Sequence, residues 1–406
     1  MKKLSLKEYN DCEILAGDNQ ILITTMESYS ELACDFLNDL SQLLRNDSEA
    51  DMYPDVKTFS FWCRRGNLKR LENAFCDGKI HRGRGLVYHI APSNVPVNFA
   101  FTFAFGLLSG NANVVRVPSE SYKQVRIICG VIQSLLMQKK YKKLQERNMI
   151  LSYPRESKLT SVISACCDIR VIWGGDNTVQ AIRQYEIKPG TIELVFPDRY
   201  SFGVIEGKRI CDSTEKDIKR LAGQFYNDTF LMDQNACSAP HLLFITKKGV
   251  SGEQLSRAMT CFWDELYQLV EEKYVMEDIK VSDKYVNLCR AAVEQTGNIQ
   301  LIKLNNLIYV LKLSKLPESI TKLRGQFGMF YTYQIESLDE IVPYVEEKIQ
   351  SMAYYGFDRE VLTSFVKNNE MNGIDRIIPF GNTMDIGVFW DGYDIIGNLS
   401  KIVDII

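Results

Sequence analysis

The stretch from residue 85 to residue 117 restricts the fold of this chain more than any other. Residues 85–90 form a short apolar run typical of a buried strand, and a proline-punctuated turn follows at 91–96. Residues 97–108 are apolar almost all round, which indicates a buried helix that Gly110-Asn111 ends before a second strand at 114–117. A strand, a helix and another strand in this order predict a β-α-β unit, which implies a parallel sheet. The chain is therefore expected to be an α/β protein.

A second unit of the same kind follows. Residues 168–173 have the pattern of a strand, Gly174-Gly175 form a turn, and Asp176 or Asn177 is expected to cap a helix that reaches about residue 185. Residues 191–196 then have the pattern of the next strand. A strand, a glycine turn and a helix N-terminus form a natural phosphate site. The turn lacks the Gly-x-Gly-x-x-Gly dinucleotide pattern, so Gly174 and Gly175 are equally compatible with a plain tight turn.

The rest of the chain also mixes helices and strands. Helices are expected at 214–227, 251–272 and 338–352, and strands at 241–246 and 306–313. Residues 1–75 have a mostly helical pattern, in which Leu32, Phe36 and Leu40 fall at helical spacing. The cluster at 390–394, with Trp390 and Tyr393, fits a folded tail or a subunit contact better than a cofactor platform.

Length and composition exclude several classes of function. The 406 residues suggest two or three domains, and a net charge of -3 does not favour a nucleic-acid or anionic-membrane partner. No apolar run reaches the ~20 residues of a membrane span, and the first residues show no secretory signal. The 11 cysteines include no Cys-x-x-Cys pair and only three histidines are present, so no metal site is expected. Free thiols fit a reducing cytoplasm.

Cys237 is the candidate nucleophile. It lies among the small residues Ala236, Ser238 and Ala239, which leave room for a substrate, and a polar run precedes it. A cysteine in such a place can attack a carbonyl. The plainer interpretation is a buried structural thiol, because free cysteine is among the most buried residue types.

Two further residues have a structural and a functional interpretation. Asn94 either caps the helix that begins near Val97 or donates its amide to an oxyanion. Arg116, at the end of a strand, is either a surface charge or a contact to a ribose phosphate, which suits the fork of its guanidinium. The residues alone do not separate these alternatives.

Together these motifs resemble the aldehyde dehydrogenase superfamily. Asn94 with Cys237, and Gly110-Asn111 with Arg116, match it in order and approximate spacing. Five segments resemble one branch more closely, the long-chain acyl-CoA reductases of the bacterial luminescence (fatty acid reductase) system: HIAPSNVPVNFAFTFAFGLLSGNANVVRVPS, WGGDNTV, DRYSF, FYNDTFLMDQNACSAP and WDGYD. The resemblance runs from about residue 80 to the end.

The resemblance implies an aldehyde dehydrogenase-like fold, with a Rossmann-type cofactor domain, an α/β catalytic domain and a short oligomerisation element. It implies a helical segment at 1–80, a nucleotide-binding domain at 81–202, a catalytic domain at 203–375 and a return or oligomerisation segment at 376–406. It further implies that Cys237 is acylated and that Asn94 and the Cys237 backbone N–H hold the oxyanion. The residues implied to bind the cofactor, NADPH or alternatively NADH, are Pro92, Ser93, Arg116, Gly174, Gly175 and Asn177.

Two departures from the superfamily pattern bear on the reaction. Val195 occupies the place of the glutamate that activates water in aldehyde-oxidising members, and Gln326 replaces the carboxylate of a Glu-x-Phe-Gly motif that elsewhere holds the nicotinamide ribose. A reductase that starts from a thioester needs no water step. We therefore expect reduction of an acyl-CoA or acyl-carrier thioester to an aldehyde by a cytoplasmic homo-oligomer, with an acyl-protein synthetase as a further partner. The alternatives are an aldehyde oxidiser that releases free acid and a non-catalytic scaffold for acyl-carrier enzymes.

Overall fold

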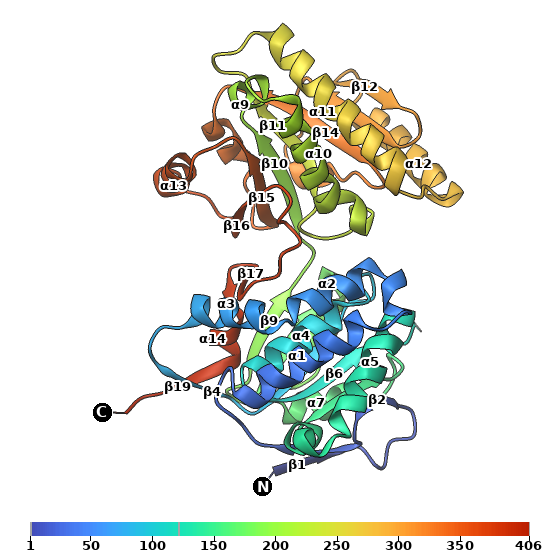
Figure 1. Ribbon diagram of the computed structural model, residues 1–406, viewed down its shortest axis with the longest axis vertical. Coiled ribbons are helices and arrows are strands. Elements are labelled where there is room, and N and C mark those ends of the chain that lie inside the picture. Colours follow the sequence, from blue (N-terminus) through green and yellow to red (C-terminus); the bar gives the residue numbers. More distant parts are fainter. Residues whose placement is uncertain (1, 121, 406) are drawn as a thin grey trace. The chain divides into compact units, whose positions relative to one another are not determined.

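The computed structural model describes residues 2–120 and 122–405, which form two compact units (Figure 1). Unit 1 comprises residues 1–198 and 387–406, and unit 2 comprises residues 199–386. Both units are α/β, as the β-α-β pattern predicts. Residues 1–80 and the segment after 386 belong to the same unit as the predicted nucleotide-binding domain. The oligomerisation role of residues 376–406 stays a prediction.

A six-stranded sheet in the order β2-β7-β6-β5-β8-β9 forms the centre of unit 1. Its strands are β2 (Glu13–Gly17), β5 (Leu86–Ile90), β6 (Ala112–Val117), β7 (Asn148–Ser152), β8 (Ile169–Trp173) and β9 (Ile192–Phe196). Strands β5 to β9 are parallel, and β2 at one edge is antiparallel. The chain leads from β5 through β6 to β7 and then returns to the other side of β5. The strand order therefore reverses between β5 and β8, which gives the expected Rossmann-type arrangement with a topological switch point.

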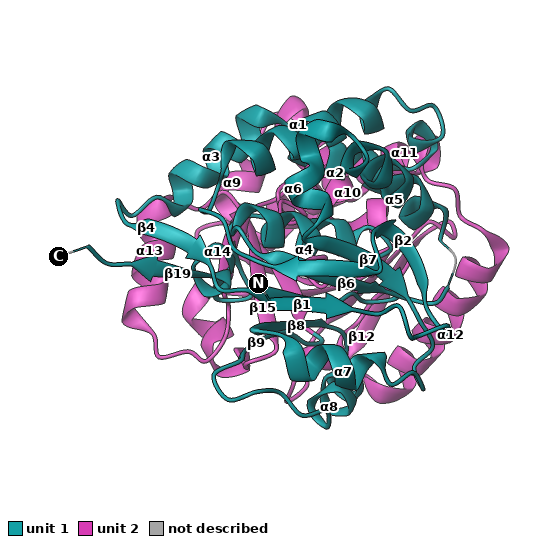
Figure 2. Cartoon of the chain, turned by 90° about the horizontal axis from the view of Figure 1, so that it is seen from below, with its two compact units in different colours: residues 1–198, 387–406 teal, residues 199–386 magenta. Residues whose placement is uncertain are grey.

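Helices cover both faces of this sheet (Figure 2). One face is covered by α1 (Glu31–Arg45), α4 (Asn98–Leu108) and α5 (Lys123–Leu136). On the opposite face α7 (Leu159–Cys166) and α8 (Asp176–Arg183) share a core with β5, β6 and β7. The apolar helix expected at 97–108 is α4, which is buried along nearly its whole length. The smaller elements are η1 (Ala50–Met52), α2 (Pro54–Trp62), α3 (Arg65–Phe75), η2 (Lys139–Tyr141) and α6 (Lys142–Gln145).

The prediction that residues 1–75 are mostly helical is wrong for residues 2–23. Helices do begin at Glu31, but β1 (Lys2–Ser5) and β3 (Gln20–Ile23) pair as an antiparallel ribbon, and β2 extends the main sheet. The side chains of Leu4, Leu6 and Ile21 are buried in the core beneath β5 and β6. Strands of four or five residues are too short to show a clear period in the sequence, and these three are defined by their partners.

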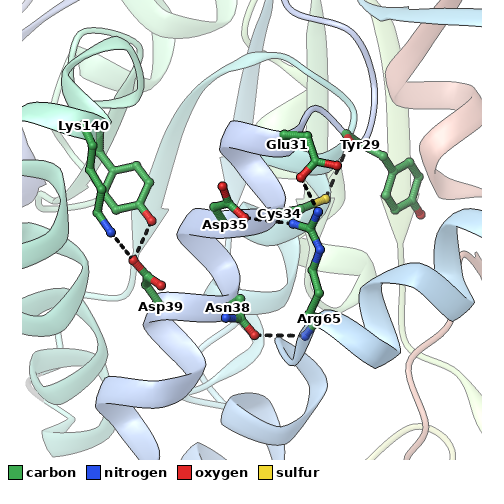
Figure 3. Close-up of polar contacts among 9 residues, drawn as sticks. Tyr29, Glu31, Cys34, Asp35, Asn38, Asp39, Arg65 and Lys140 are labelled. Carbon is green, nitrogen blue, oxygen red and sulfur yellow. Dashed lines mark hydrogen bonds and ion pairs between the residues drawn. The ribbon is translucent and has the colours of Figure 1, made fainter.

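Helix α1 is held by its apolar face and by ion pairs at its exposed face (Figure 3). Arg65 pairs with Glu31 and Asp35, and Asp39 pairs with Lys140. Exposed pairs of this kind contribute little to stability, ~0–1 kcal/mol each. The helix is therefore anchored mainly by a buried stripe that includes Phe36, Leu37, Leu40 and Leu44.

The C-terminal tail returns to unit 1. Strands β17 (Phe389–Trp390) and β18 (Tyr393–Asp394) form a hairpin whose turn residues, Asp391 and Gly392, both have positive φ. After α14 (Ile395–Leu399), strand β19 (Ser400–Val403) pairs with β4 (Ile80–Gly83) in antiparallel fashion. The aromatic cluster at 390–394 is thus part of a folded tail.

Unit 2 is built on a seven-stranded sheet in the order β12-β13-β14-β11-β10-β15-β16. Its strands are β10 (Tyr200–Ile205), β11 (Pro240–Thr246), β12 (Ile299–Leu304), β13 (Ile308–Leu313), β14 (Met329–Ile335), β15 (Ile349–Tyr355) and β16 (Arg376–Pro379). All neighbouring strands are parallel except the pair β12 and β13. Helices α10 (Glu215–Thr229) and α11 (Gly252–Lys273) pack on one face, and α12 (Asp278–Glu294) and α13 (Arg359–Asn368) on the other. The short helices are α9 (Gly207–Cys211), η3 (Phe230–Met232), η4 (Ile320–Lys322) and η5 (Leu338–Tyr344).

The helix predicted at 338–352 is wrong. The segment forms the 3₁₀ helix η5, which contains Pro343, and then the buried strand β15 between β10 and β16. Ile349, Met352 and Ala353 are apolar at i, i+3 and i+4, which imitates a helix. A strand buried on both faces shows no alternation, so periodicity alone cannot identify it.

Candidate active site

The carboxyl ends of β5 and β8 carry five of the predicted site residues in unit 1. The two strands are neighbours in register, with Ile90 beside Ile172. The loop at 91–97, with Pro92, Ser93 and Asn94, therefore leaves the same edge of the sheet as the turn Gly174-Gly175. Ligands of open α/β sheets bind outside the carboxyl ends of the strands at such a switch point.

Asn94 does not cap the helix that follows it. Helix α4 begins at Asn98 with Val97 as its N-cap residue, and no side chain caps it. Within the described residues the Asn94 side chain is exposed and forms no hydrogen bond. The capping alternative is therefore wrong, and the amide is available to donate to a ligand.

The turn after β8 has more room than the fold requires. Gly175 has an ordinary negative φ of -63°, and a Cβ added there would meet no atom within 4 Å. A glycine that neither conformation nor packing demands leaves space for a ligand to approach the backbone. Gly175 is also the N-cap residue of α8, which corrects the expected capping by Asp176 or Asn177. Both of those residues lie exposed in the first turn of the helix.

Arg116 lies at the carboxyl end of β6, next to β5, and is partly buried. Its guanidinium lies 4.8 Å from the centre of the Tyr153 ring, and its Nη2 donates a long 3.4 Å hydrogen bond to the Tyr153 carbonyl. Its Nε is buried and has no hydrogen-bond partner among the described residues. The side chain is therefore held in place while part of its donor capacity is unused, which suits an anionic ligand.

In unit 2 the predicted nucleophile Cys237 lies at the edge of the sheet formed by the amino ends of the strands. It comes just before β11. The Cys237 residue is partly exposed, whereas Ala236 and Ser238 on either side are buried. The Ser201 hydroxyl donates a 2.7 Å hydrogen bond to the Cys237 carbonyl and accepts one of 3.2 Å from the Ser351 backbone N–H. The loop is thus fixed to the start of β10 and to β15.

The segment just before Cys237 has a constrained backbone. Asp233 and Gln234 both have left-handed φ values, 54° and 59°. Such a conformation costs of order 1 kcal/mol per non-glycine residue and persists only where the surroundings enforce it. Here the buried Gln234 side chain accepts a 2.8 Å hydrogen bond from the Gly328 backbone N–H and donates one of 3.2 Å to the Met329 carbonyl. These two hydrogen bonds of Gln234 therefore hold the cysteine loop against residues 325–329.

Residues 325–328, where the sequence departs from the superfamily motif, adjoin the cysteine loop because β14 lies beside β11. Gln326 Nε2 donates to Asn235 Oδ1 at 3.4 Å, and Gln326 Oε1 accepts from Asn287 at 3.1 Å. Added Cβ atoms at Gly325 and Gly328 would lie 1.7 and 2.3 Å from the backbone oxygens of Met329 and Leu307. The two glycines are required by this close backbone packing.

Helix α12 supplies residues that the sequence did not identify. Lys280 donates to Asp233 at 3.2 Å, and the buried Lys284 donates to the carbonyls of Asn306, Leu307 and Phe327. Together with Asn287 they lie at i, i+4 and i+7, so one helix face holds both loops. Burial, with a smaller contribution from Lys303, lowers the pKa of Lys284 to about 7. Lysines at this spacing are typical of a solvated helix face, so nothing in the sequence marks them.

The two fully enclosed histidines are not charged partners for a thiolate. His89 is hydrogen-bonded through both ring nitrogens, to Thr102 and Asn113, and burial lowers its pKa to about 4. His241, in β11, donates from Nδ1 to the Gly325 carbonyl at 3.0 Å. Burial, and then Arg324, lower its pKa to about 4 as well. Both imidazoles are therefore neutral near pH 7, and His89 is a core residue of unit 1.

The segment that carries a water-activating glutamate in oxidising enzymes has no such group at position 195. Val195 is a partly buried residue of β9 that packs against the core. Glu193 on the same strand is paired with the buried Arg170 and with Arg183, at 2.5 and 2.6 Å. The Glu193 carboxylate is therefore already engaged by two guanidiniums.

Across residues 2–120 and 122–405, no group of three or more His, Cys, Asp or Glu side chains is placed to hold a metal ion. In the same residues all eleven cysteines are present as thiols. None of the helices in the described part of the chain combines the length and hydropathy needed to cross a membrane.

Comparison with known families agrees with this arrangement. The family model for acyl-CoA reductases (LuxC) matches residues 69–403. The chain belongs to the acyl-CoA reductase family. The activity that gives this family its name belongs to the enzyme class expected from the motifs, the oxidoreductases that act on acyl and aldehyde groups. Comparison with curated proteins gives no significant match.

Solved structures show that this acyl-CoA reductase family member has the aldehyde dehydrogenase fold. Aldehyde dehydrogenase 21 from Physcomitrella patens is similar with a TM-score of 0.63 at 12% identity, over 92% of this chain and 85% of the other. The NAD-dependent benzaldehyde dehydrogenase from Corynebacterium glutamicum has a TM-score of 0.59 at 12% identity, over 92% and 84%. A proline utilization A variant from Bradyrhizobium japonicum has a TM-score of 0.62 at 12% identity, over 92% of this chain. The chain spans only 42% of that protein.

Proposed function

We propose that this protein reduces an acyl thioester to an aldehyde, with NADPH as reductant and Cys237 as the covalently acylated residue. The observation that carries the proposal is the setting of Cys237. It is a partly exposed residue between buried small residues, in a loop fixed by Gln234 and Ser201. Membership of the acyl-CoA reductase family supports a coenzyme A thioester as the acyl donor.

Acyl transfer begins with the Cys237 thiolate. Its Sγ attacks the thioester carbonyl carbon, the carbon–sulfur bond to coenzyme A breaks, and the coenzyme A thiolate leaves and takes a proton from water. The Asn94 amide, which forms no hydrogen bond with any described residue, donates to the oxyanion of the tetrahedral intermediate. One such donor contributes about 2.7–4 kcal/mol to the stability of the transition state.

The residues at the switch point fit a nicotinamide nucleotide. Arg116 has an unused buried donor for a phosphate, and Gly175 leaves space beside the N-terminus of α8. Pro92, Ser93 and Asn177 would line the same site. A bound NADPH, or alternatively NADH, would supply the hydride that reduces the acyl carbon. Cys237 Sγ then leaves the resulting thiohemiacetal as the carbonyl forms again, which releases the aldehyde and restores the thiolate.

The lack of a water-activating carboxylate at position 195 favours reduction over hydrolysis. Val195 carries no acid, and Glu193 is engaged by two arginines. An acyl-enzyme whose hydrolysis is not assisted by such a group survives longer, until hydride transfer. The same feature disfavours oxidation of an aldehyde to free acid, the second function expected from the sequence.

The setting in the cell is also a proposal. We place the protein in the cytoplasm as a homo-oligomer, supported by its eleven free thiols and by the returning tail, whose strand β19 forms a two-stranded sheet with β4. The acyl donor is acyl-CoA or an acyl carrier, and an acyl-protein synthetase would be a further partner.

The test is aldehyde formation from decanoyl-CoA and NADPH by the purified protein. We expect decanal in amounts equal to the NADPH consumed, and none from C237S. The matched control is C261S, which alters an exposed cysteine on α11 and should keep full activity. Decanal formation by C237S, or release of decanoic acid alone by the native protein, would overturn the proposal.

A further inference from the structure

A pocket of about 830 Å³ lies in unit 2 between α12 and the segment at 317–326. Its walls include Asn287, Arg290 and Glu294 from the helix, and Lys322, Arg324 and Gln326 from the segment. Its volume is within the usual range of ligand pockets, ~300–1,000 Å³.

The pocket is joined to the cysteine loop by direct contacts. Gln326 is part of its wall and also donates to Asn235, two residues before Cys237. Asn287 on the opposite wall donates from its side-chain amide to Gln326 Oε1 at 3.1 Å. A ligand in this pocket therefore lies against the residues that hold the reactive loop.

The charge of the walls favours an anion. Three cations, Arg290, Lys322 and Arg324, face one carboxylate, Glu294. Arg290 and Lys322 are exposed, and their side chains have no carboxylate partner in the described parts of the chain. Arg324 is held in place by the Arg199 carbonyl at 2.9 Å and lies over the Tyr200 ring. Arginine and lysine so arranged suit phosphate groups.

The other large pocket of unit 2, of about 860 Å³, has the opposite character. It is lined by Glu206, Glu336, Asp339 and Glu360 with two lysines, and it lies beyond Thr246, at the far end of β11 from Cys237. It is therefore a poor place for a phosphate ligand of the reaction. Replacement of its two lysines, Lys208 and Lys248, therefore provides a control for the loss of two positive charges.

We propose that the basic pocket binds the phosphate-bearing nucleotide half of a coenzyme A thioester while its acyl group is transferred to Cys237. The inference rests on the proposed function, since it assigns a place to the donor of that reaction. The cofactor's phosphates have their own candidate site at Arg116 and Gly175 in unit 1, which leaves this pocket for the second phosphorylated reactant. The Tyr331 and Pro317 side chains supply apolar surface for its adenine.

The test compares two donors of the same acyl group, decanoyl-CoA and S-decanoyl-pantetheine, which lacks the phosphates. We expect the R290Q/K322Q variant to lose about 10- to 100-fold in kcat/KM for decanoyl-CoA, chiefly through KM, because two charge-assisted contacts are lost. Its kinetics with S-decanoyl-pantetheine and its KM for NADPH should stay within about twofold of the native values. The matched variant K208Q/K248Q, which removes the same charge from the other pocket, should behave as the native protein.

Equal losses with both thioesters, a rise in the KM for NADPH alone, or unchanged kinetics with decanoyl-CoA would overturn the proposal. Calorimetric titration of C237S with coenzyme A gives a readout that needs no turnover. R290Q/K322Q introduced into C237S should weaken this binding by about 10-fold or more, and unchanged binding would contradict the assignment. Failure of the proposed function is distinct, because it would remove aldehyde formation from the native protein with both thioesters.

Discussion

The Gln234 side chain accepts a hydrogen bond from the Gly328 backbone N–H at 2.8 Å, and this contact joins two loops that lie 94 positions apart in the chain. One loop carries Cys237, and the other carries Gln326. Both loops lead into neighbouring parallel strands, β11 and β14, so the bond fixes the amino edge of the sheet in unit 2, where the proposed chemistry takes place.

Replacement of Gln234 by alanine should therefore destabilise unit 2. The change leaves the Gly328 N–H and the Met329 carbonyl buried without partners, at a cost of about 1–3 kcal/mol each. We expect a loss of about 2–5 kcal/mol in the free energy of unfolding, measured by urea titration. Q234E retains the acceptor for Gly328 and should lose less, and equal stability of Q234A and the native protein would contradict the described role.

Replacement of Asn94 by alanine should separate activity from stability. Because the Asn94 side chain is exposed and forms no internal hydrogen bond, N94A should unfold within about 0.5 kcal/mol of the native protein. Loss of one oxyanion donor should lower kcat by about 10²–10³-fold. The measurement is steady-state reduction of decanoyl-CoA together with urea unfolding. An active N94A, or one that is unstable, would contradict the role of this amide.

Arg116 is expected to contribute to the choice between the two nicotinamide cofactors. If its unused donor contacts the phosphate that distinguishes NADPH from NADH, R116Q should raise the KM for NADPH by about 10-fold or more and change that for NADH little. The ratio of kcat/KM values for the two cofactors is the quantity to measure. A parallel loss with both would show that Arg116 has no part in discrimination.

The buried Lys284 predicts an unusual dependence of stability on pH. Its pKa in the folded protein is about 7, below the ordinary value of 10.5, so the unfolded chain binds more protons between these values. Stability attributable to this group therefore rises as pH increases from about 7 toward 10.5, by at most about 1.4 kcal/mol per pH unit.

The K284M variant tests this dependence. It removes the donor to three buried carbonyls and should be less stable than the native protein, with the difference growing between pH 7 and pH 9. Urea unfolding at several pH values measures it, and K248M, which alters an exposed lysine, is the control and should show no such growth. A difference that stays constant as pH rises would show that Lys284 is charged throughout this range.

The sequence predicts some parts of this protein far better than others, for physical reasons. The β-α-β motif of β5, α4 and β6 can be predicted because its sequence signals are local: a short apolar run, a proline turn and an apolar helix. The pattern of β15 predicts a helix instead of a strand, since burial on both faces removes its alternation. The sequence also names Cys237, whose small neighbours are adjacent in the chain.

The side-chain contacts that hold the candidate site in place cannot be predicted from local sequence patterns. Gln234, Ser201 and Lys284 act through partners that are 22 to 150 positions away, and no local pattern encodes such contacts. The cap role considered for Asn94 fails because α4 begins four residues later than Asn94, at Asn98. The sequence indicates the candidate nucleophile, and folding adds the contacts that hold its loop.

Intact-mass spectrometry after mixing with decanoyl-CoA, without NADPH, tests the central claim most directly. A covalent acyl-enzyme should appear as one added decanoyl group on the native protein and on C261S, and should be absent from C237S. Addition of NADPH should remove the group and yield decanal. A native protein that gains no mass, or a C237S variant that gains it, would contradict the account.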